Sequence, residues 1–214
     1  MSLRRLLLPA ALCLLVFLTE TAASGAPEIN LDVRWYGQTG DGSWERDNLG
    51  TSETLTIRTH GCALTAASMV LKYLDIRTNP GRLNRWLLKN GGYADGWDDS
   101  SSAYLGKVRI IWTVPADKLD RISEYRRRDF HNEPADTELI REYLEKGIPV
   151  IAEVRLPDGT PHFVVIHGFR KEDFLIRDPL DRKIRRLSDK YNLSDRWGSG
   201  AARNIYGLRI YLPG

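Results

Sequence analysis

The chain of 214 residues has few cysteines, little net charge and no internal repeats. Each of these features excludes a class of protein. Cys13 and Cys62 are too few for a disulfide framework and show no zinc-ligand spacing with histidine. Thirty-one Lys and Arg against 28 Asp and Glu leave a formal charge of +3, too weak to indicate nucleic acid or an anionic membrane as partner. No period of roughly 20 to 50 residues recurs, and no glycine-rich phosphate loop opens a helix. These absences favour one globular domain without a cofactor.

Residues 1–26 have the organisation of an export signal, with two arginines, a 13-residue apolar run over 6–18 and then small residues. The run is shorter than the ~20 residues that span a bilayer, and no second long run follows. We therefore expect a cleaved signal peptide, a domain over 27–214, and a secreted or periplasmic protein without stable membrane insertion. An uncleaved N-terminal anchor is the alternative. Cleavage removes two Arg and one Glu, so the charge becomes 29 − 27 = +2 and Cys62 becomes the sole cysteine.

Apolar periodicity predicts three helices in the domain. The first, over 62–74, carries no charge before its last turn, so we expect it to be buried on most sides. The second, over 81–89, follows an Asn-Pro opening. The third covers 136–146, with Asp136 as its N-cap and Gly147 as its stop.

The rest of the pattern is typical of strands. Short apolar segments separated by turns predict strands over 30–35, 149–154, 162–169, 174–176, 183–187 and 205–211. Asp158 and Gly159 form a hairpin-type turn between the second and third of these. Helices followed by a set of antiparallel strands predict an α+β fold.

Cys62 opens the first helix, in a Gly-Cys-Ala-Leu-Thr segment. The unpaired N–H groups and the macrodipole at a helix N-terminus favour a thiolate. A lone thiol in an oxidising compartment has no intramolecular partner, so its placement here suits a nucleophile. A buried, inert cysteine is the alternative.

A cysteine nucleophile needs a partner, because an ordinary thiol titrates near ~8.5. A neighbouring imidazolium stabilises the thiolate, and a carboxylate then orients the imidazole. His162 stands at the entrance of its strand, whereas His167, five positions later, points to the opposite face. Asp178 closes the next strand and is held extended by Pro179. A core histidine and a turn aspartate are the alternatives for these two residues.

Two further groups are weaker candidates. Gln38, in a polar loop, is an oxyanion-hole donor if it acts together with the backbone N–H of Cys62. Asp95, Asp98 and Asp99 could hold calcium, but they lack a recognisable ligand loop. Such a cluster is more typical of a solvated acidic turn, so we expect no metal.

The order of these motifs resembles family thirty-nine of the cysteine peptidases, the papain-like enzymes related to bacteriocin-leader processing. The segments that carry the resemblance are 38–44, 61–65, 69–73, 79–93, 147–151, 161–168 and 177–179. The resemblance implies a papain-like fold whose Cys-bearing central helix packs on an antiparallel sheet, with a peptide or protein as substrate. It also implies Cys62 as nucleophile, His162 as general base, Asp178 as its orienter and Gln38 as oxyanion donor.

The substrate does not follow from this resemblance. The best-known relatives are cytosolic domains of exporters that cleave after a double glycine, whereas we expect this chain to be exported and to act without a transporter. Two function classes remain. The first is a secreted thiol hydrolase that acts on a peptide or other amide bond through an acyl-enzyme. The second is a non-catalytic peptide-binding or accessory module that retains the fold. The intact set of Cys62, His162 and Asp178 favours the hydrolase.

Overall fold

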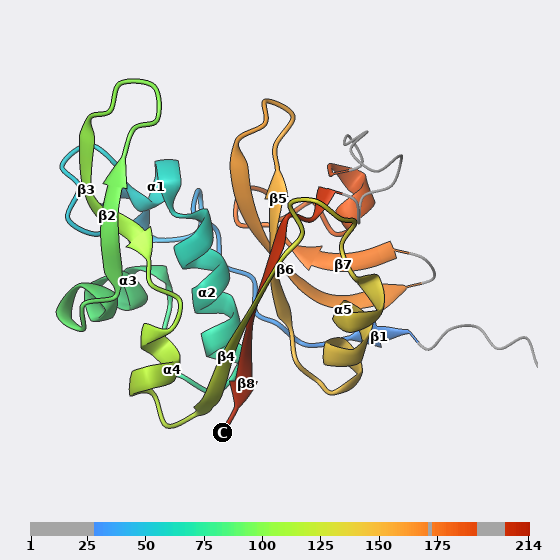
Figure 1. The fold of residues 1–214 in the computed structure, drawn as a ribbon. Coiled ribbons are helices and arrows are strands. Elements are labelled where there is room, and N and C mark those ends of the chain that lie inside the picture. Colours follow the sequence, from blue (N-terminus) through green and yellow to red (C-terminus); the bar gives the residue numbers. More distant parts are fainter. Residues whose placement is uncertain (1–27, 171–172, 192–203) are drawn as a thin grey trace, which may run out of the picture.

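The computed structural model describes residues 28–170, 173–191 and 204–214 of the chain (Figure 1). The expected signal peptide over 1–26, together with Cys13, lies outside these residues. Within them, no helix is both long enough and apolar enough to cross a membrane.

The described residues form two lobes that lie side by side (Figure 1). The first lobe carries four helices, α1 (Ile57–His60), α2 (Cys62–Tyr73), α3 (Pro80–Lys89) and α4 (Val114–Lys118), and the ribbon of β2 (Tyr93–Trp97) and β3 (Tyr104–Ile110). The second lobe carries α5 (Thr137–Glu145) and six strands, β1 (Ile29–Asn30), β4 (Ile122–Asp129), β5 (Val150–Arg155), β6 (Pro161–Arg170), β7 (Asp173–Arg177) and β8 (Gly207–Pro213). Short 3-10 turns cover Ser43–Arg46 and Leu187–Asp189. The mixture of helices and antiparallel sheet confirms the expected fold class.

The sheet runs in the order β1-β6-β5-β8-β4, and β7 also pairs with β6. All of these pairings are antiparallel. In the β6–β7 pair, Val165 lies opposite Arg177. Asp178, directly after the end of β7, is therefore brought close to His162 at the start of β6.

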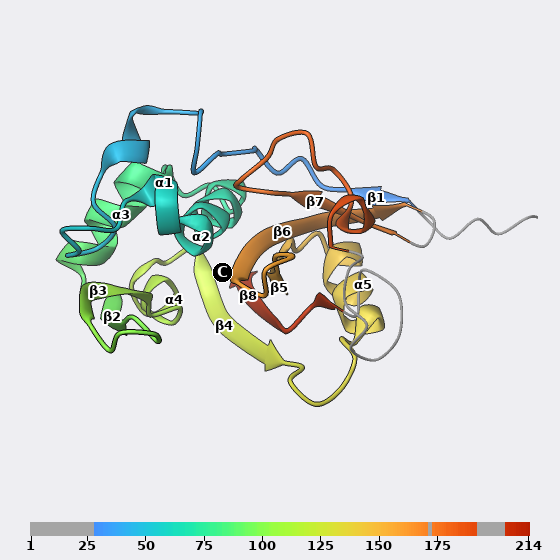
Figure 2. The same cartoon turned by 90° about the horizontal axis from the view of Figure 1, so that it is seen from above.

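Two apolar cores occupy the two faces of the sheet. Val150 and Val154 of β5 pack into the core with α5, whereas Ile151 between them packs into the core with α2. Both faces are buried, so the central strands read as nearly continuous apolar runs. Figure 2 shows α2 and α5 on opposite sides of the sheet, with α2 between the sheet and the ribbon β2–β3.

The start of α2 is fixed by the turn that precedes it. Thr56 caps α1 by accepting a hydrogen bond from Thr59 N–H, and α1 ends at Gly61, which is also the N-cap of α2. A Cβ at Gly61 would collide with the carbonyl oxygen of Ile57, so the chain needs glycine at this junction. Cys62 is therefore held as the first residue of a buried helix, as the sequence predicts.

The other predicted helices are also confirmed. Asn79 caps α3 through its side chain, and Pro80 follows as the first helical residue. Asp136 caps α5 by accepting from Leu139 N–H, and Gly147 ends it with a φ of 74°. The turn at Asp158 joins β5 and β6 as predicted.

Two strand predictions are wrong, each for a local reason. The strand expected over 30–35 is limited to β1, because the Val33 N–H turns back to Leu31 O instead of to a neighbouring strand. Residues 183–187 form a turn with a single bridge between Leu175 and Arg186. The carboxylate of Asp189 accepts the backbone N–H groups there, so few remain for a ladder.

Three strands appear where the sequence predicts none. The ribbon β2–β3 contains Gly96, Gly106 and Asp95, residue types that are typical of loops. β4 lies at the edge of the sheet and carries Arg126, Arg127 and Arg128. Charged side chains are common on edge strands because they prevent further pairing.

Candidate active site

The structure brings Cys62, His162 and Asp178 together from three elements. His162 Nε2–H donates a hydrogen bond of 2.8 Å to Asp178 Oδ1, and both side chains are almost completely buried. The Cys62 side chain lies beside the other edge of the His162 ring, and its interaction with the ring favours the protonated form. Since Asp178 takes Nε2, the nitrogen that faces the sulfur is Nδ1.

These contacts decide the charge of the His162 ring. Burial alone would lower its pKa, but the hydrogen bonds to Asp178 and Cys62 and the negative charges of the two partners raise it to about 9. The ring therefore holds a proton at neutral pH beside the thiol. Asp178 stays ionised: burial works to raise its pKa, but the bonds from His162, Tyr191 and the Leu180 N–H lower it overall.

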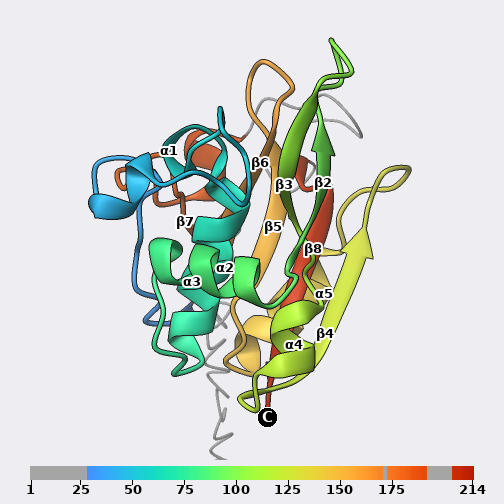
Figure 3. The same cartoon turned by 90° about the vertical axis from the view of Figure 1, so that its left-hand side faces the viewer.

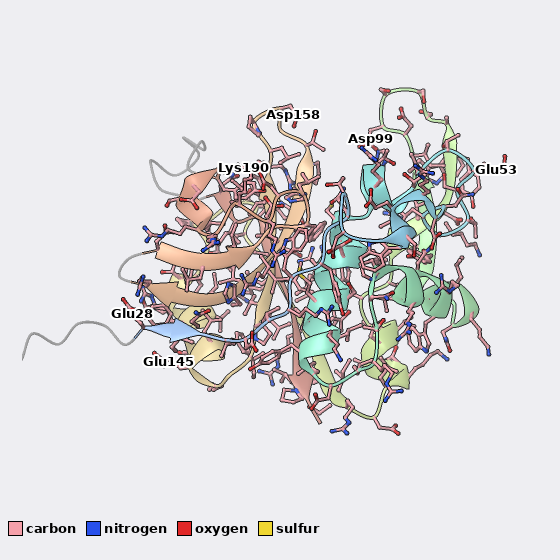
Figure 4. The ribbon with its side chains drawn as sticks, turned by 180° about the vertical axis from the view of Figure 1, so that it is seen from behind. Glu28, Glu53, Asp99, Glu145, Asp158 and Lys190 are labelled. Atoms are coloured by element: carbon pink, nitrogen blue, oxygen red, sulfur yellow. The ribbon has the colours of Figure 1, made fainter. Side chains whose placement is uncertain are left out.

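Tyr191 completes the surroundings of the carboxylate. Its hydroxyl donates a 2.7 Å hydrogen bond to Asp178 Oδ2, and its ring stacks on His162 with centroids 6.1 Å apart. The side chain is fully buried. Lys190, labelled in Figure 4, lies 3.6 Å from the same oxygen. Sequence reasoning missed Tyr191, because it follows Asp178 by 13 positions and no motif or spacing marks it.

Gln38 lies near the site but forms no hydrogen bond with the side chains of Cys62, His162 or Asp178. Its backbone N–H donates to Pro179 O, and its Nε2 donates a 3.0 Å bond to Arg58 O in α1. Its Oε1 is buried without a partner among the described residues. An amide nitrogen has two N–H groups, and the bond to Arg58 uses one of them. The amide is thus anchored beside the turn that leads to Cys62, with one donor left.

A cleft of about 810 Å³ opens beside Cys62. In Figure 3 the strands of the ribbon β2–β3 are roughly aligned with β5 and β8 of the sheet. The apolar lining comes from both lobes: Leu49, Leu55, Ala63, Ala94, Trp97, Leu105, Val108, Ile110, Trp112 and Phe163. Charged residues among the lining are Arg109, Arg127, Glu153 and Arg209. Gln38, His162 and Asp178 are not among the residues that line this cleft.

The remaining candidates lie elsewhere. His167 Nδ1–H donates to Leu31 O at 3.0 Å, and burial, reinforced by the charge of Arg177, lowers its pKa to about 4. It is therefore a neutral histidine that shares none of the contacts of His162. Of the acidic cluster, Asp98 accepts hydrogen bonds from Ser100 and Ser101, which caps its own turn. In the part of the chain that the structure describes, no group of three His, Cys, Asp or Glu side chains could hold a metal ion.

Comparisons with known proteins identify the family and the fold of the chain. The model of the peptidase C39-like family matches residues 30–202. Among solved structures, a candidate C39-like peptidase from Bacillus anthracis aligns with a TM-score of 0.53 and 13% identity, over 86% of this chain and 97% of that one. No curated protein matches the chain. The structural likeness shows the fold, and the family match covers most of the chain. The protein therefore belongs to the peptidase C39-like family.

Proposed function

We propose that the protein is an exported cysteine peptidase that cleaves peptide or other amide bonds through an acyl-enzyme on Cys62. The observation that carries the proposal is the alignment of Cys62, His162 and Asp178, in which the buried His162 ring is hydrogen-bonded to the buried Asp178 and lies beside the partly exposed Cys62 side chain. A merely structural histidine has no need of a carboxylate on one nitrogen and a thiol on the other. Family membership supports the reaction class, and the composition of residues 1–26 supports export.

In the resting pair, the Cys62 proton resides on His162 Nδ1. The thiolate attacks the substrate carbonyl carbon, a C–S bond forms, and the carbonyl π electrons move to oxygen. The backbone N–H of Cys62 and the remaining N–H of Gln38 are the donors available for that oxyanion. When the intermediate collapses, the C–N bond breaks and His162 gives its proton to the leaving amine.

Hydrolysis of the acyl-enzyme reverses the role of His162. The ring, now neutral, takes a proton from water while the water oxygen attacks the thioester carbon. Collapse breaks the C–S bond, releases the acid and regenerates the thiolate–imidazolium pair. Asp178 keeps its charge throughout and holds the ring in the tautomer that presents Nδ1 to the sulfur. Tyr191 in turn holds Asp178.

The alternative function is a peptide-binding module that uses the same cleft without turnover. Such a protein would need the cleft but not the alignment of Cys62, His162 and Asp178. The complete set therefore favours catalysis over binding alone.

Alkylation of Cys62 by iodoacetamide tests the pair directly, because the reagent reacts with the thiolate. We expect faster reaction at neutral pH than with a free thiol of the same exposure, because the imidazolium of His162 stabilises the attacking sulfur. His162→Ala should slow the reaction at that pH at least about tenfold, since the neighbouring cation is lost. His167→Asn, a substitution on the same strand, is the matched control and should leave the rate unchanged. Equal rates in all three proteins would contradict the proposal.

A further inference from the structure

The cleft beside Cys62 has a mainly apolar lining. Ala63, which follows Cys62 on α2, belongs to it, as do the rings of Trp112 and Phe163, whose centroids are 5.5 Å apart. Trp97 of β2 adds a third aromatic ring and is 58% exposed. A substrate that reacts at Cys62 and fills this cleft therefore contacts these rings.

The size of the cleft indicates what fills it. At about 810 Å³ it lies in the range of sites that enclose a large part of a ligand. A substrate with glycines next to the scissile bond would leave the aromatic walls in contact with water. A bulky apolar side chain would cover them, and burying such a side chain favours binding by roughly 10- to 100-fold over none.

The charges around the cleft disfavour basic side chains in the substrate. Arg127 and Arg209 line the cleft and share the carboxylate of Asp129, while Arg209 also pairs with Glu153. Arg109, on the ribbon, also lines the cleft, and its Nε donates to a backbone oxygen, Asp95 O, instead of to a carboxylate. Guanidinium groups thus outnumber the carboxylates around the cleft, so it disfavours a Lys or Arg side chain.

We propose that the substrate is a peptide that places an aromatic or branched aliphatic side chain in this cleft, within two residues of the scissile bond. The cleft selects such peptides over those with glycine, Lys or Arg at that position. The inference rests on the proposed function for its link to cleavage. Trp97 is a specificity-determining residue, because it comes from the ribbon and forms no part of the Cys62–His162–Asp178 line.

The experiment separates binding from cleavage. Alanine-based peptides of one length carry a single Phe, Leu, Gly or Arg at each position in turn. Their binding to the Cys62→Ala protein is measured by fluorescence anisotropy, and their cleavage by the unsubstituted protein is followed by mass spectrometry. We expect Phe and Leu peptides to bind at least about tenfold more tightly than Gly or Arg peptides. They should also be cleaved within two residues of the guest.

The substitution Trp97→Ala tests whether this side chain determines the specificity of the cleft. This side chain is largely exposed, so its removal should leave the fold intact, and a thermal melt checks this. In the Cys62→Ala background it should reduce the preference for Phe over Gly about fivefold or more. Leu88→Ala, at an apolar side chain 41% exposed on α3 and outside the cleft, is the control and should change nothing.

The outcomes distinguish the two proposals. Equal binding of all guests, or tightest binding of Gly, overturns the cleft inference whether or not peptides are cleaved. Cleavage without side-chain preference also overturns it and leaves the proposed function standing. Selective binding of Phe and Leu peptides without any cleavage would support the proposed selectivity of the cleft and contradict the proposed peptidase activity.

Discussion

His162 and His167 lie on the same strand, both almost completely buried, and their pKa values are shifted in opposite directions. The pKa of His162 is raised to about 9, and that of His167 is lowered to about 4. Burial acts in the same direction on both rings, so it does not explain the difference. What differs is the partner: a carboxylate and a thiol for His162, and a backbone carbonyl near Arg177 for His167.

The comparison teaches that β6 provides two environments within five residues. At its start the strand meets α2 and the end of β7, where charges face the ring. Further along it meets β1, which offers a peptide oxygen. The protonation state of a histidine in a strand therefore depends on the groups that face its ring and not on how deeply the ring is buried.

The largest expected effect comes from exchanging each ring for an amide. His162→Asn should lower peptide hydrolysis by about 10³-fold or more, because both the thiolate's partner and the proton donor are lost. His167→Asn should retain most activity at pH 7.5, where this ring is already neutral. Initial rates on one cleavable peptide measure both. Comparable losses in the two variants would show that the rings are not functionally distinct.

A second prediction concerns stability. Because the folded-state pKa of His167 lies below its unfolded value of ~6.5, its contribution is complete above pH 6.5 and is lost as the pH falls toward 4. The loss from this group is on the order of 3 kcal/mol in the free energy of unfolding. For His162 the sign is reversed: its contribution is complete below pH 6.5 and is lost as the pH rises through 9.

Urea unfolding at several pH values measures these losses. His167→Asn should flatten the acid side of the stability profile and leave the alkaline side unchanged. An acid side as steep as in the unsubstituted protein would mean that another group is responsible.

The smallest expected effect is at Tyr191, which acts on His162 through Asp178. Tyr191→Phe should lower kcat about tenfold and leave KM unchanged, because the hydroxyl holds the carboxylate and does not line the cleft. In an Asp178→Ala background the same change should have no further effect on kcat. An additive loss would indicate that Tyr191 supports only the fold.

Much of the fold could be predicted because α2, α3 and α5 have both apolar spacing and end signals. Asn79 and Asp136 are caps whose chemistry is local, so the sequence alone places them. β5 and β6 are buried on both faces and read as apolar runs. The ribbon β2–β3 and strand β4 are stabilised by pairing with other strands and not by their own composition. Such pairing depends on distant parts of the chain, so local sequence patterns do not predict these strands.

The candidate site shows the same division. Cys62, His162 and Asp178 each follow a recognisable turn or strand boundary, and the structure brings them together. Tyr191 has no local signal, since its role exists only when the chain folds back onto Asp178. The contacts of Gln38 with Arg58 and Pro179 are equally non-local, and the sequence predicts its proximity to Cys62 but not how its amide is held.

The segment before Gln38 is hydrogen-bonded to Asp178, the residue of the site that comes last in the sequence. Trp35 Nε1–H donates to Asp178 O across 143 positions of sequence. During synthesis, Cys62 leaves the ribosome 100 residues before His162 and 116 before Asp178, since 162 − 62 = 100 and 178 − 62 = 116. Contacts over such separations form late, because the intervening chain must be complete before its ends can meet. The thiol is therefore made long before the groups that surround it. A chain interrupted before Tyr191 contains Cys62 but lacks the residue that holds Asp178.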